Sequence, residues 1–250
     1  GSRTTSYLQA GDAVSTPDLS AAVRVDHWYF LSGVDVLADR SAGAIAILGD
    51  AITDGRGSTT NGNDRWPDNL ARRLQADKAT AQVAVLNHGI GGNRLLRDGL
   101  GPNARARIDR DILVQPGVRW LIVLEGINDI GTGSDARAKG EPAATAEDII
   151  GAYDQIVECA HAHGIRVYGA TIMPFEGFGY ANYFTTEGEA DRQRVNTWIR
   201  TSGAFDAVID LDKATRDPEH PSRLALAVDG GDHLHPSPAG YRIIADAVDL

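Results

Sequence analysis

The sequence predicts an α/β fold in which a parallel sheet carries helices on both of its faces. Two observations lead to this prediction. Five short apolar runs end in small or polar residues, and segments with helical periodicity separate these runs along the chain. This alternation is typical of a parallel sheet, because each crossover between parallel strands usually contains a helix that packs on the sheet.

The expected strands are continuous apolar runs that are bounded by turn residues. Runs of this kind suit strands that are buried on both faces, as the strands of a parallel sheet are. The five runs span residues 44–48, 82–86, 120–124, 166–172 and 207–209.

The expected helices lie between these runs and after the last one. Thr145 and Asp148 have the spacing of a capping box, which indicates where one helix begins. Apolar residues recur at helical spacing in each of the other segments. The helices are expected over 66–76, 145–163 and 189–201, and from residue 237 onward.

Composition excludes several classes of protein. The 250 residues include 24 lysines and arginines against 34 aspartates and glutamates, a net charge of −10, and no basic cluster. This balance argues against binding to nucleic acid or to an anionic membrane. No apolar run reaches the roughly 18 residues of a membrane span. Cys159 is the single cysteine, so neither an intrachain disulfide nor a cysteine metal cluster is possible.

We expect one main domain over residues 44–250 and an N-terminal extension over residues 1–43. Gly1 and Ser2 resemble the remnant of a cloning site. Short strands are expected in the extension around 21–25 and 28–30. We expect an extended lead-in that lies against the main domain, and the alternative is a partly disordered linker left by an excised domain.

Small, polar and amide residues concentrate directly after the expected strands. In an open parallel sheet, ligands bind beyond the carboxyl ends of the strands. Glycines in these segments let the backbone approach a ligand closely. We therefore expect one site built from residues 49–55, 87–94, 125–129 and 229–236.

Four motifs in these segments follow the order found in the SGNH hydrolases, the GDSL-type esterases and lipases. Residues 49–53 read Gly-Asp-Ala-Ile-Thr, where the family has Gly-Asp-Ser-(Ile/Leu)-Thr. Gly92 matches the glycine after the second strand, residues 126–129 match Gly-x-Asn-Asp, and residues 232–236 match Asp-x-x-His-Pro. The chain resembles this family, and the resemblance implies a three-layer, flavodoxin-like fold with five parallel strands.

The resemblance also implies a reaction, acyl transfer to water through an acyl-enzyme. His235 is the expected general base, and Asp232 is expected to hold its imidazole in the required tautomer. The expected donors to the oxyanion are the backbone N–H groups of Ala51 and Gly92 and the side-chain amide of Asn128. No metal and no cofactor are implied.

The chain departs from the family motif at the nucleophile. Ala51 stands where the motif has serine, and because alanine has no oxygen, we expect a chain that is nearly inert as an esterase. Two interpretations are open: an engineered substitution that holds an uncleaved ligand, or the natural residue of a non-catalytic protein. The Asp232–His235 pair, which a pure binder would not need, favours the first.

The expected substrate is a small carboxylic ester with a short acyl chain on a carbohydrate or another polar alcohol. Candidate substrate contacts are Asp50, Asn93, Arg94, Phe175 and Tyr183. Their alternatives are structural: a turn aspartate, a surface arginine, and a small aromatic core under the loop at 174–186.

The sequence also leaves two alternative functions open. A lipase-like acyl hydrolase and a non-catalytic carbohydrate-binding protein are the alternatives. A flavodoxin-like nucleotide binder is disfavoured, because neither a phosphate loop nor a dinucleotide-binding glycine pattern follows the first strand. Similarity to secreted members of the family, around 65–70 and from 187 to the end, favours an extracellular protein over a cytoplasmic one.

Overall fold

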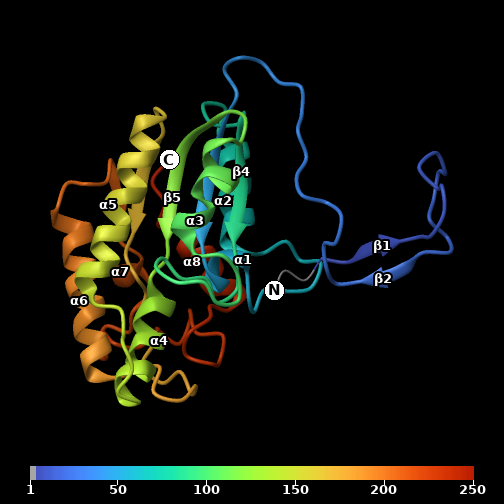
Figure 1. Ribbon diagram of the computed structural model, residues 1–250. Coiled ribbons are helices and arrows are strands. Elements are labelled where there is room, and N and C mark those ends of the chain that lie inside the picture. The colour runs from blue at the N-terminus through green and yellow to red at the C-terminus, as the bar shows by residue number, and fades with distance from the viewer. Residues whose placement is uncertain (1–3) are drawn as a thin grey trace.

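The computed structural model describes residues 4–250 and places a five-stranded sheet at the centre of the chain's main body (Figure 1). All neighbouring strands are parallel, in the order β4-β3-β5-β6-β7. This is the flavodoxin-like order, so the predicted fold class is confirmed. The strands are β3 (Gly43–Gly49), β4 (Val83–Gly89), β5 (Val118–Leu124), β6 (Arg166–Ala170) and β7 (Ala207–Ile209).

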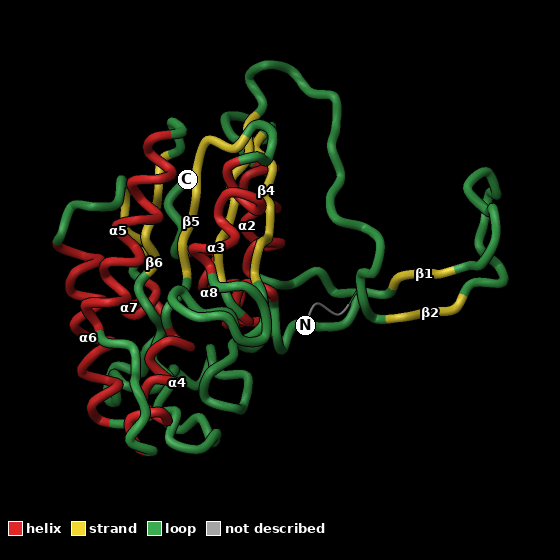
Figure 2. The backbone as a smooth tube through the Cα atoms, viewed as in Figure 1, coloured by secondary structure: helices red, strands yellow, loops and turns green. Residues whose placement is uncertain are grey.

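Helices cover both faces of this sheet (Figure 2). On one face, α2 (Trp66–Ala76) packs against α8 (Pro238–Asp246). On the other face, α5 (Ala146–Ala162) packs against α6 (Thr186–Thr201) and α3 (Ala104–Ile108). The connection from β3 to β4 runs toward one edge of the sheet, and the later connections run toward the other edge. Because each crossover is right-handed, their helices lie on opposite faces. No helix within residues 4–250 is both long and apolar enough to cross a membrane.

The long helices agree closely with the sequence pattern. Helix α2 has the predicted bounds, and α5 begins after Thr145. Thr145 Oγ1 accepts from Asp148 N at 3.1 Å and Asp148 Oδ2 accepts from Thr145 N at 2.9 Å, which is the predicted capping box. One expectation is wrong: β4 and β7 are not fully buried, because they form the two edges of the sheet.

Short helices after the strands were not expected from the sequence. Two of them, α1 and α7, begin two residues after a strand ends, and α4 begins three residues after the end of β5. The helices are α1 (Ala51–Asp54), α4 (Ile127–Ala138) and α7 (Leu211–Thr215), and η1 (Asp109–Leu113) is a π-helix.

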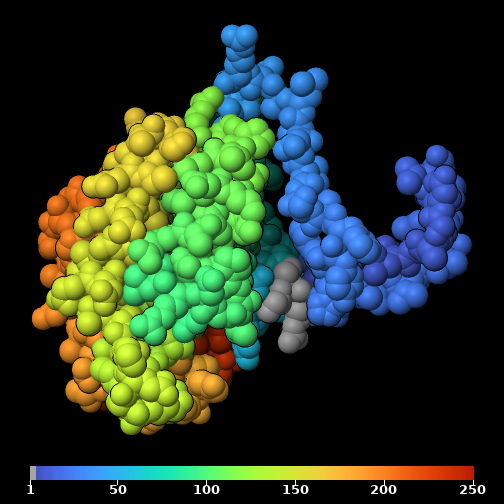
Figure 3. Space-filling view, in the orientation of Figure 1, coloured from blue at the N-terminus to red at the C-terminus, as the bar shows by residue number. Residues whose placement is uncertain are grey.

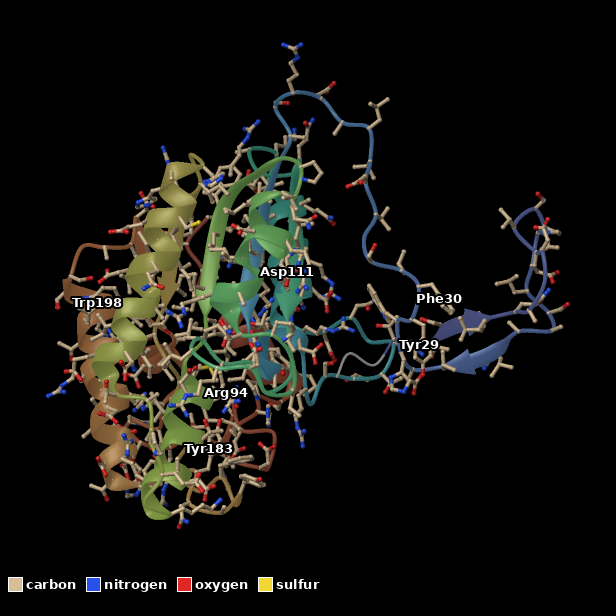
Figure 4. The ribbon with its side chains drawn as sticks, viewed as in Figure 1. Tyr29, Phe30, Arg94, Asp111, Tyr183 and Trp198 are labelled. Carbon is tan, nitrogen blue, oxygen red and sulfur yellow. The ribbon has the colours of Figure 1, made fainter. Side chains whose placement is uncertain are left out.

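The N-terminal extension stands away from the main body (Figure 3). It forms an antiparallel hairpin of β1 (Ser6–Leu8) and β2 (Val23–Val25), and Thr5 is anchored by hydrogen bonds to Asn61. The second expected strand does not form, and Phe30 is 88% exposed (Figure 4). The prediction that the extension lies against the main domain is therefore wrong for most of its length, because its apolar side chains find no partner surface there.

The carboxyl ends of β3 and β4 approach α1 closely. Ile90 N donates to Gly49 O at 2.9 Å, which joins the two strand ends. A Cβ on Gly89 would lie 2.1 Å from Asp54 N, so only glycine leaves room for the backbone of α1. This contact fixes α1 on the sheet edge.

The same substitution is therefore expected to have opposite effects at two glycines. Gly89→Ala should lower the free energy of unfolding by about 2 kcal/mol or more, because the methyl group overlaps backbone. Gly151→Ala in α5, where nothing lies within 4 Å, should raise it by about 1 kcal/mol, because alanine is the better helix former. Urea denaturation of both variants measures the difference, and equal effects would contradict the described close approach.

Candidate active site

The segment after β3 forms helix α1, whose first residue is Ala51. Asp50 Oδ1 accepts from Ile52 N at 2.8 Å and so caps the helix. The first N–H groups of a helix have no partner within it, which leaves the N–H of Ala51 as a donor at the edge of the sheet. Ala51 is 9% exposed, so position 51 is at the surface only through a narrow opening.

Asp232 and His235 form a hydrogen-bonded pair on the loop before α8. Asp232 Oδ1 accepts from the backbone N of His235 at 2.8 Å, and Oδ2 lies 2.7 Å from His235 Nδ1. One carboxylate oxygen thus shapes the turn, and the other orients the imidazole. With Nδ1–H donating to the carboxylate, Nε2 carries the lone pair.

This loop packs against the segment that follows α1. Tyr241 on α8 donates to Arg56 O at 2.5 Å, and a Cβ on Gly57 would lie 3.0 Å from Pro236 O. His235 is 7% exposed. The structure therefore places the Asp–His loop beside the residues that follow α1.

Burial sets the protonation of this pair. It lowers the pKa of His235, against the opposing effect of Asp232. Burial alone would raise the pKa of Asp232, but the hydrogen bonds from His235 hold it below its ordinary value. A neutral imidazole beside an ionised carboxylate is the arrangement that a general base needs.

Asn128 lies at the start of α4 with its amide held from both ends. Its Oδ1 accepts from the Tyr183 hydroxyl at 2.7 Å, and its Nδ2 donates to Asn93 O at 2.8 Å. The two bonds together assign the oxygen and nitrogen ends of the amide. The second N–H of Nδ2 is then available to a ligand.

The loop that carries Gly92 is tied to the same helix. Asp129 accepts from Leu95 N at 2.8 Å and from Leu96 N at 3.1 Å. Gly92 has a φ of +72°, a conformation that favours glycine. The Gly92 loop and Asn128 are therefore held in one fixed arrangement.

Beneath these groups, the fully buried guanidinium of Arg107 joins three strand ends. It donates to Gly49 O at 3.1 Å, to His88 O at 2.7 Å and to Asn93 Oδ1 at 2.6 Å. It also lies 3.4 Å from Glu125 Oε1 at the end of β5. One side chain thus connects β3, β4, β5 and the Gly92 loop.

Two buried carboxyl groups, Asp50 and Glu125, lie near this cation, and a third, Asp129, lies near Arg94. Burial raises the pKa of Asp50 to about 7 and the pKa of Asp129 to about 6. Burial, helped by the charge of Asp50, also raises the pKa of Glu125 well above its ordinary value. Protonation relieves the repulsion that one guanidinium cannot balance.

Most of the candidate substrate contacts are buried. Phe175 is 0% exposed, Asp50 and Asn93 are each 1% exposed, and Tyr183 is 4% exposed. Their prediction as substrate contacts is corrected accordingly: Asp50 caps α1, Asn93 joins Arg107 to Asn128, and the aromatic pair forms the small core that was the alternative.

Arg94 differs from the other four candidates. It is half-buried and lines a cavity of about 180 Å³ between the Gly92 loop, α4 and the segment at 141–144. Figure 4 shows Arg94 near Tyr183, beyond the end of the sheet.

A comparison with protein families matches residues 47–243 to the GDSL-like Lipase/Acylhydrolase family. The chain belongs to this family. The match includes the end of β3, all of β4 to β7, and the loops described above. A search of the curated proteins gave no match.

Solved structures of this GDSL-like family share the fold at low sequence identity. A catalytic mutant of the acetylxylan esterase Axe2 from Geobacillus stearothermophilus is 24% identical, with a TM-score of 0.61 over 82% of this chain and 91% of that one. The aryl esterase of M. smegmatis is 19% identical, with a TM-score of 0.61 over 82% and 96%. A GDSL-like lipase from Bacteroides thetaiotaomicron is 16% identical, with a TM-score of 0.61 over 86% and 89%.

The sequence analysis does not predict the roles of two residues of the site, Tyr183 and Arg107. Tyr183 was selected as an aromatic loop residue, and nothing local indicated that its hydroxyl would bond Asn128. Arg107 lies in a segment for which the sequence analysis predicts no element. Arg107 and Asp111 are four residues apart, which is the spacing of an ion pair on a helix, and the structure shows that ion pair at 3.1 Å.

The Tyr183 hydroxyl is expected to affect turnover and not binding. In the Ala51→Ser background, Tyr183→Phe should lower kcat for 4-nitrophenyl acetate roughly fivefold to tenfold with KM unchanged, because the amide of Asn128 loses the bond that orients it. Steady-state kinetics give both constants.

Tyr180→Phe is the matched control, since Tyr180 lies in the same loop and is 64% exposed. It should leave kcat unchanged. A change in KM alone for Tyr183→Phe, or an equal effect of the two variants, would contradict the positioning role.

Proposed function

We propose that this chain carries the machinery of a serine esterase with alanine at the nucleophile position. With serine at position 51, it hydrolyses a small carboxylic ester through an acyl-enzyme; with Ala51, it binds the ester without cleaving it. The observation that carries the proposal is the hydrogen-bonded pair of the half-buried Asp232 and the buried His235, packed against the segment that follows position 51.

The proton path follows from the assigned tautomer. His235 Nε2 takes the proton of a hydroxyl at position 51 as that oxygen attacks the ester carbonyl. The imidazolium is stabilised by Asp232 and returns the proton to the leaving alcohol. Water then attacks the acyl-enzyme with the same base, which restores the hydroxyl.

The oxyanion receives hydrogen bonds from neutral donors in this proposal. They are the N–H groups of residue 51 and Gly92 and the Nδ2 of Asn128. Each sits on backbone that is tied to a strand end, so the donors need little rearrangement during the reaction. Loss of one such donor typically costs about 2.7–4 kcal/mol of transition-state stabilisation.

The surroundings of the site support a polar substrate with a short acyl group. Phe175 and Tyr183 belong to the core and do not wall an apolar channel. The cavity beside Asn128 is lined by charged and polar side chains, among them Arg94 and Thr132. The acetylxylan esterase relative, whose name describes a short acyl group on a polysaccharide, fits the same class.

Ala51 itself favours a second function, a non-catalytic carbohydrate-binding protein. Such a protein would use the same cavity but would have no need of a nucleophile. The two functions differ in what happens when a hydroxyl is supplied at position 51.

Ala51→Ser should raise the rate of 4-nitrophenyl acetate hydrolysis on the order of a thousandfold or more, because it supplies the single absent group of the triad. The acid limb of its kcat/KM profile should have a midpoint below the ordinary histidine value of about 6.5, since burial lowers the pKa of His235. Release of 4-nitrophenol, followed across pH 4–9, measures both the rate and the midpoint of the acid limb.

The double variant Ala51→Ser/His235→Ala serves as the control and should return to the background rate. Esters from acetyl to decanoyl test the acyl length, and the acetyl ester should be the best substrate. An Ala51→Ser chain that is no faster than the original would support the carbohydrate-binding function instead.

A further inference from the structure

Arg94 is a half-buried cation without a carboxylate partner. Its Nη1 lies 3.5 Å from the Thr132 hydroxyl, and its Nη2 donates to the backbone oxygen of Asp98. Among residues 4–250, no carboxylate oxygen lies within 4.0 Å of its guanidinium. Arg137 and Arg200, which are also partly buried, each pair with an aspartate. Arg94 therefore retains an unused charge at a cavity wall.

The cavity in front of Arg94 is lined by residues that neighbour one of the proposed oxyanion donors, Asn128. Thr132 lines this cavity. It lies one turn after Asn128 on α4, about 6 Å along the helix axis, and its hydroxyl donates to Asn128 O at 2.6 Å. Asn93, the residue before Arg94, accepts the amide of Asn128. A group bound by Arg94 would thus belong to the same small molecule as a carbonyl bound by Asn128.

The acidic residues that line the cavity form no ion pair with Arg94, although the charge of Arg94 acts on Asp129. Asp129 has both oxygens occupied by backbone N–H groups. Asp135 pairs with Lys139 at 2.6 Å. Glu141 is exposed to solvent, where its charge is screened.

We propose that Arg94 binds a carboxylate group of the ester substrate. This inference rests on the proposed esterase function and narrows its substrate class to anionic esters. The planar guanidinium can present two N–H groups to the two oxygens of a carboxylate. The carboxylate belongs either to the acyl half, as in a half-ester of a dicarboxylic acid, or to the alcohol half, as in an acetylated sugar acid.

Matched pairs of esters separate these two sources. Phenyl hemisuccinate and phenyl butyrate differ in charge on the acyl side, and an acetylated methyl uronoside and its neutral hexoside differ on the alcohol side. In the Ala51→Ser chain, the anionic member of one pair should have a kcat/KM that is roughly tenfold higher or more. Titration of the released acid in a pH-stat measures all four substrates.

Arg94→Gln should abolish this preference while it leaves kcat/KM for the neutral esters within about twofold. Arg94→Lys should keep part of the preference, because lysine keeps the positive charge but lacks the paired N–H groups of the guanidinium. Arg242→Gln on the exposed side of α8 is the control and should change nothing. Equal loss on neutral and anionic esters in Arg94→Gln, or no preference in either pair, would overturn the inference.

The two proposals fail in distinguishable ways. An Ala51→Ser chain that hydrolyses 4-nitrophenyl acetate but shows no charge preference retains the esterase function and contradicts the carboxylate site. If that chain is inactive, calorimetry of the unaltered chain with the same pairs decides: tighter binding of an anionic ester that is lost in Arg94→Gln supports the site, and its absence overturns it.

Discussion

The arrangement of the site depends on one buried guanidinium. Arg107 donates to the carbonyl groups at the ends of β3 and β4 and to Asn93 on the Gly92 loop, and it contacts Glu125 at the end of β5. Gly49 O also accepts from Ile90 N, so the guanidinium adds a second hydrogen bond to that carbonyl at the strand end. A lysine could supply the charge but not the several N–H groups in one plane. The geometry of the strand ends therefore follows from the fork of a single side chain.

This central cation also determines the charge of its surroundings. It is one positive group near Asp50 and Glu125, both of them buried. Within the described residues, Glu125 Oε2 has no hydrogen-bond partner, which fits the raised pKa of a carboxyl group held in its neutral form. A neutral Glu125 carboxyl group beneath the site adds no charge that would repel a developing oxyanion. The Asp232–His235 pair, on a different loop, keeps its ionised carboxylate at the other side.

The sequence predicts those parts of the structure that depend on short-range patterns. The five strands are continuous apolar runs, and the capping box at Thr145 and the Asp232–His235 pair each span four residues. The role of Tyr183 depends on a contact with Asn128, 55 residues away. Whether an aromatic loop residue faces a ligand or the core depends on the space beside Gly131, where a Cβ would lie 2.2 Å from the Tyr183 ring. Such a fit is a property of the packed structure and has no local pattern.

The central claim is that this edge of the sheet is a complete hydrolase site except for one hydroxyl. A fluorophosphonate tests it directly, because it reacts with a serine only when a base and an oxyanion hole activate that serine. Mass spectrometry of the Ala51→Ser chain should show one phosphonyl group, on the peptide that contains residue 51, and none when His235→Ala is added. Absence of labelling at that peptide, or labelling that survives His235→Ala, would contradict the account.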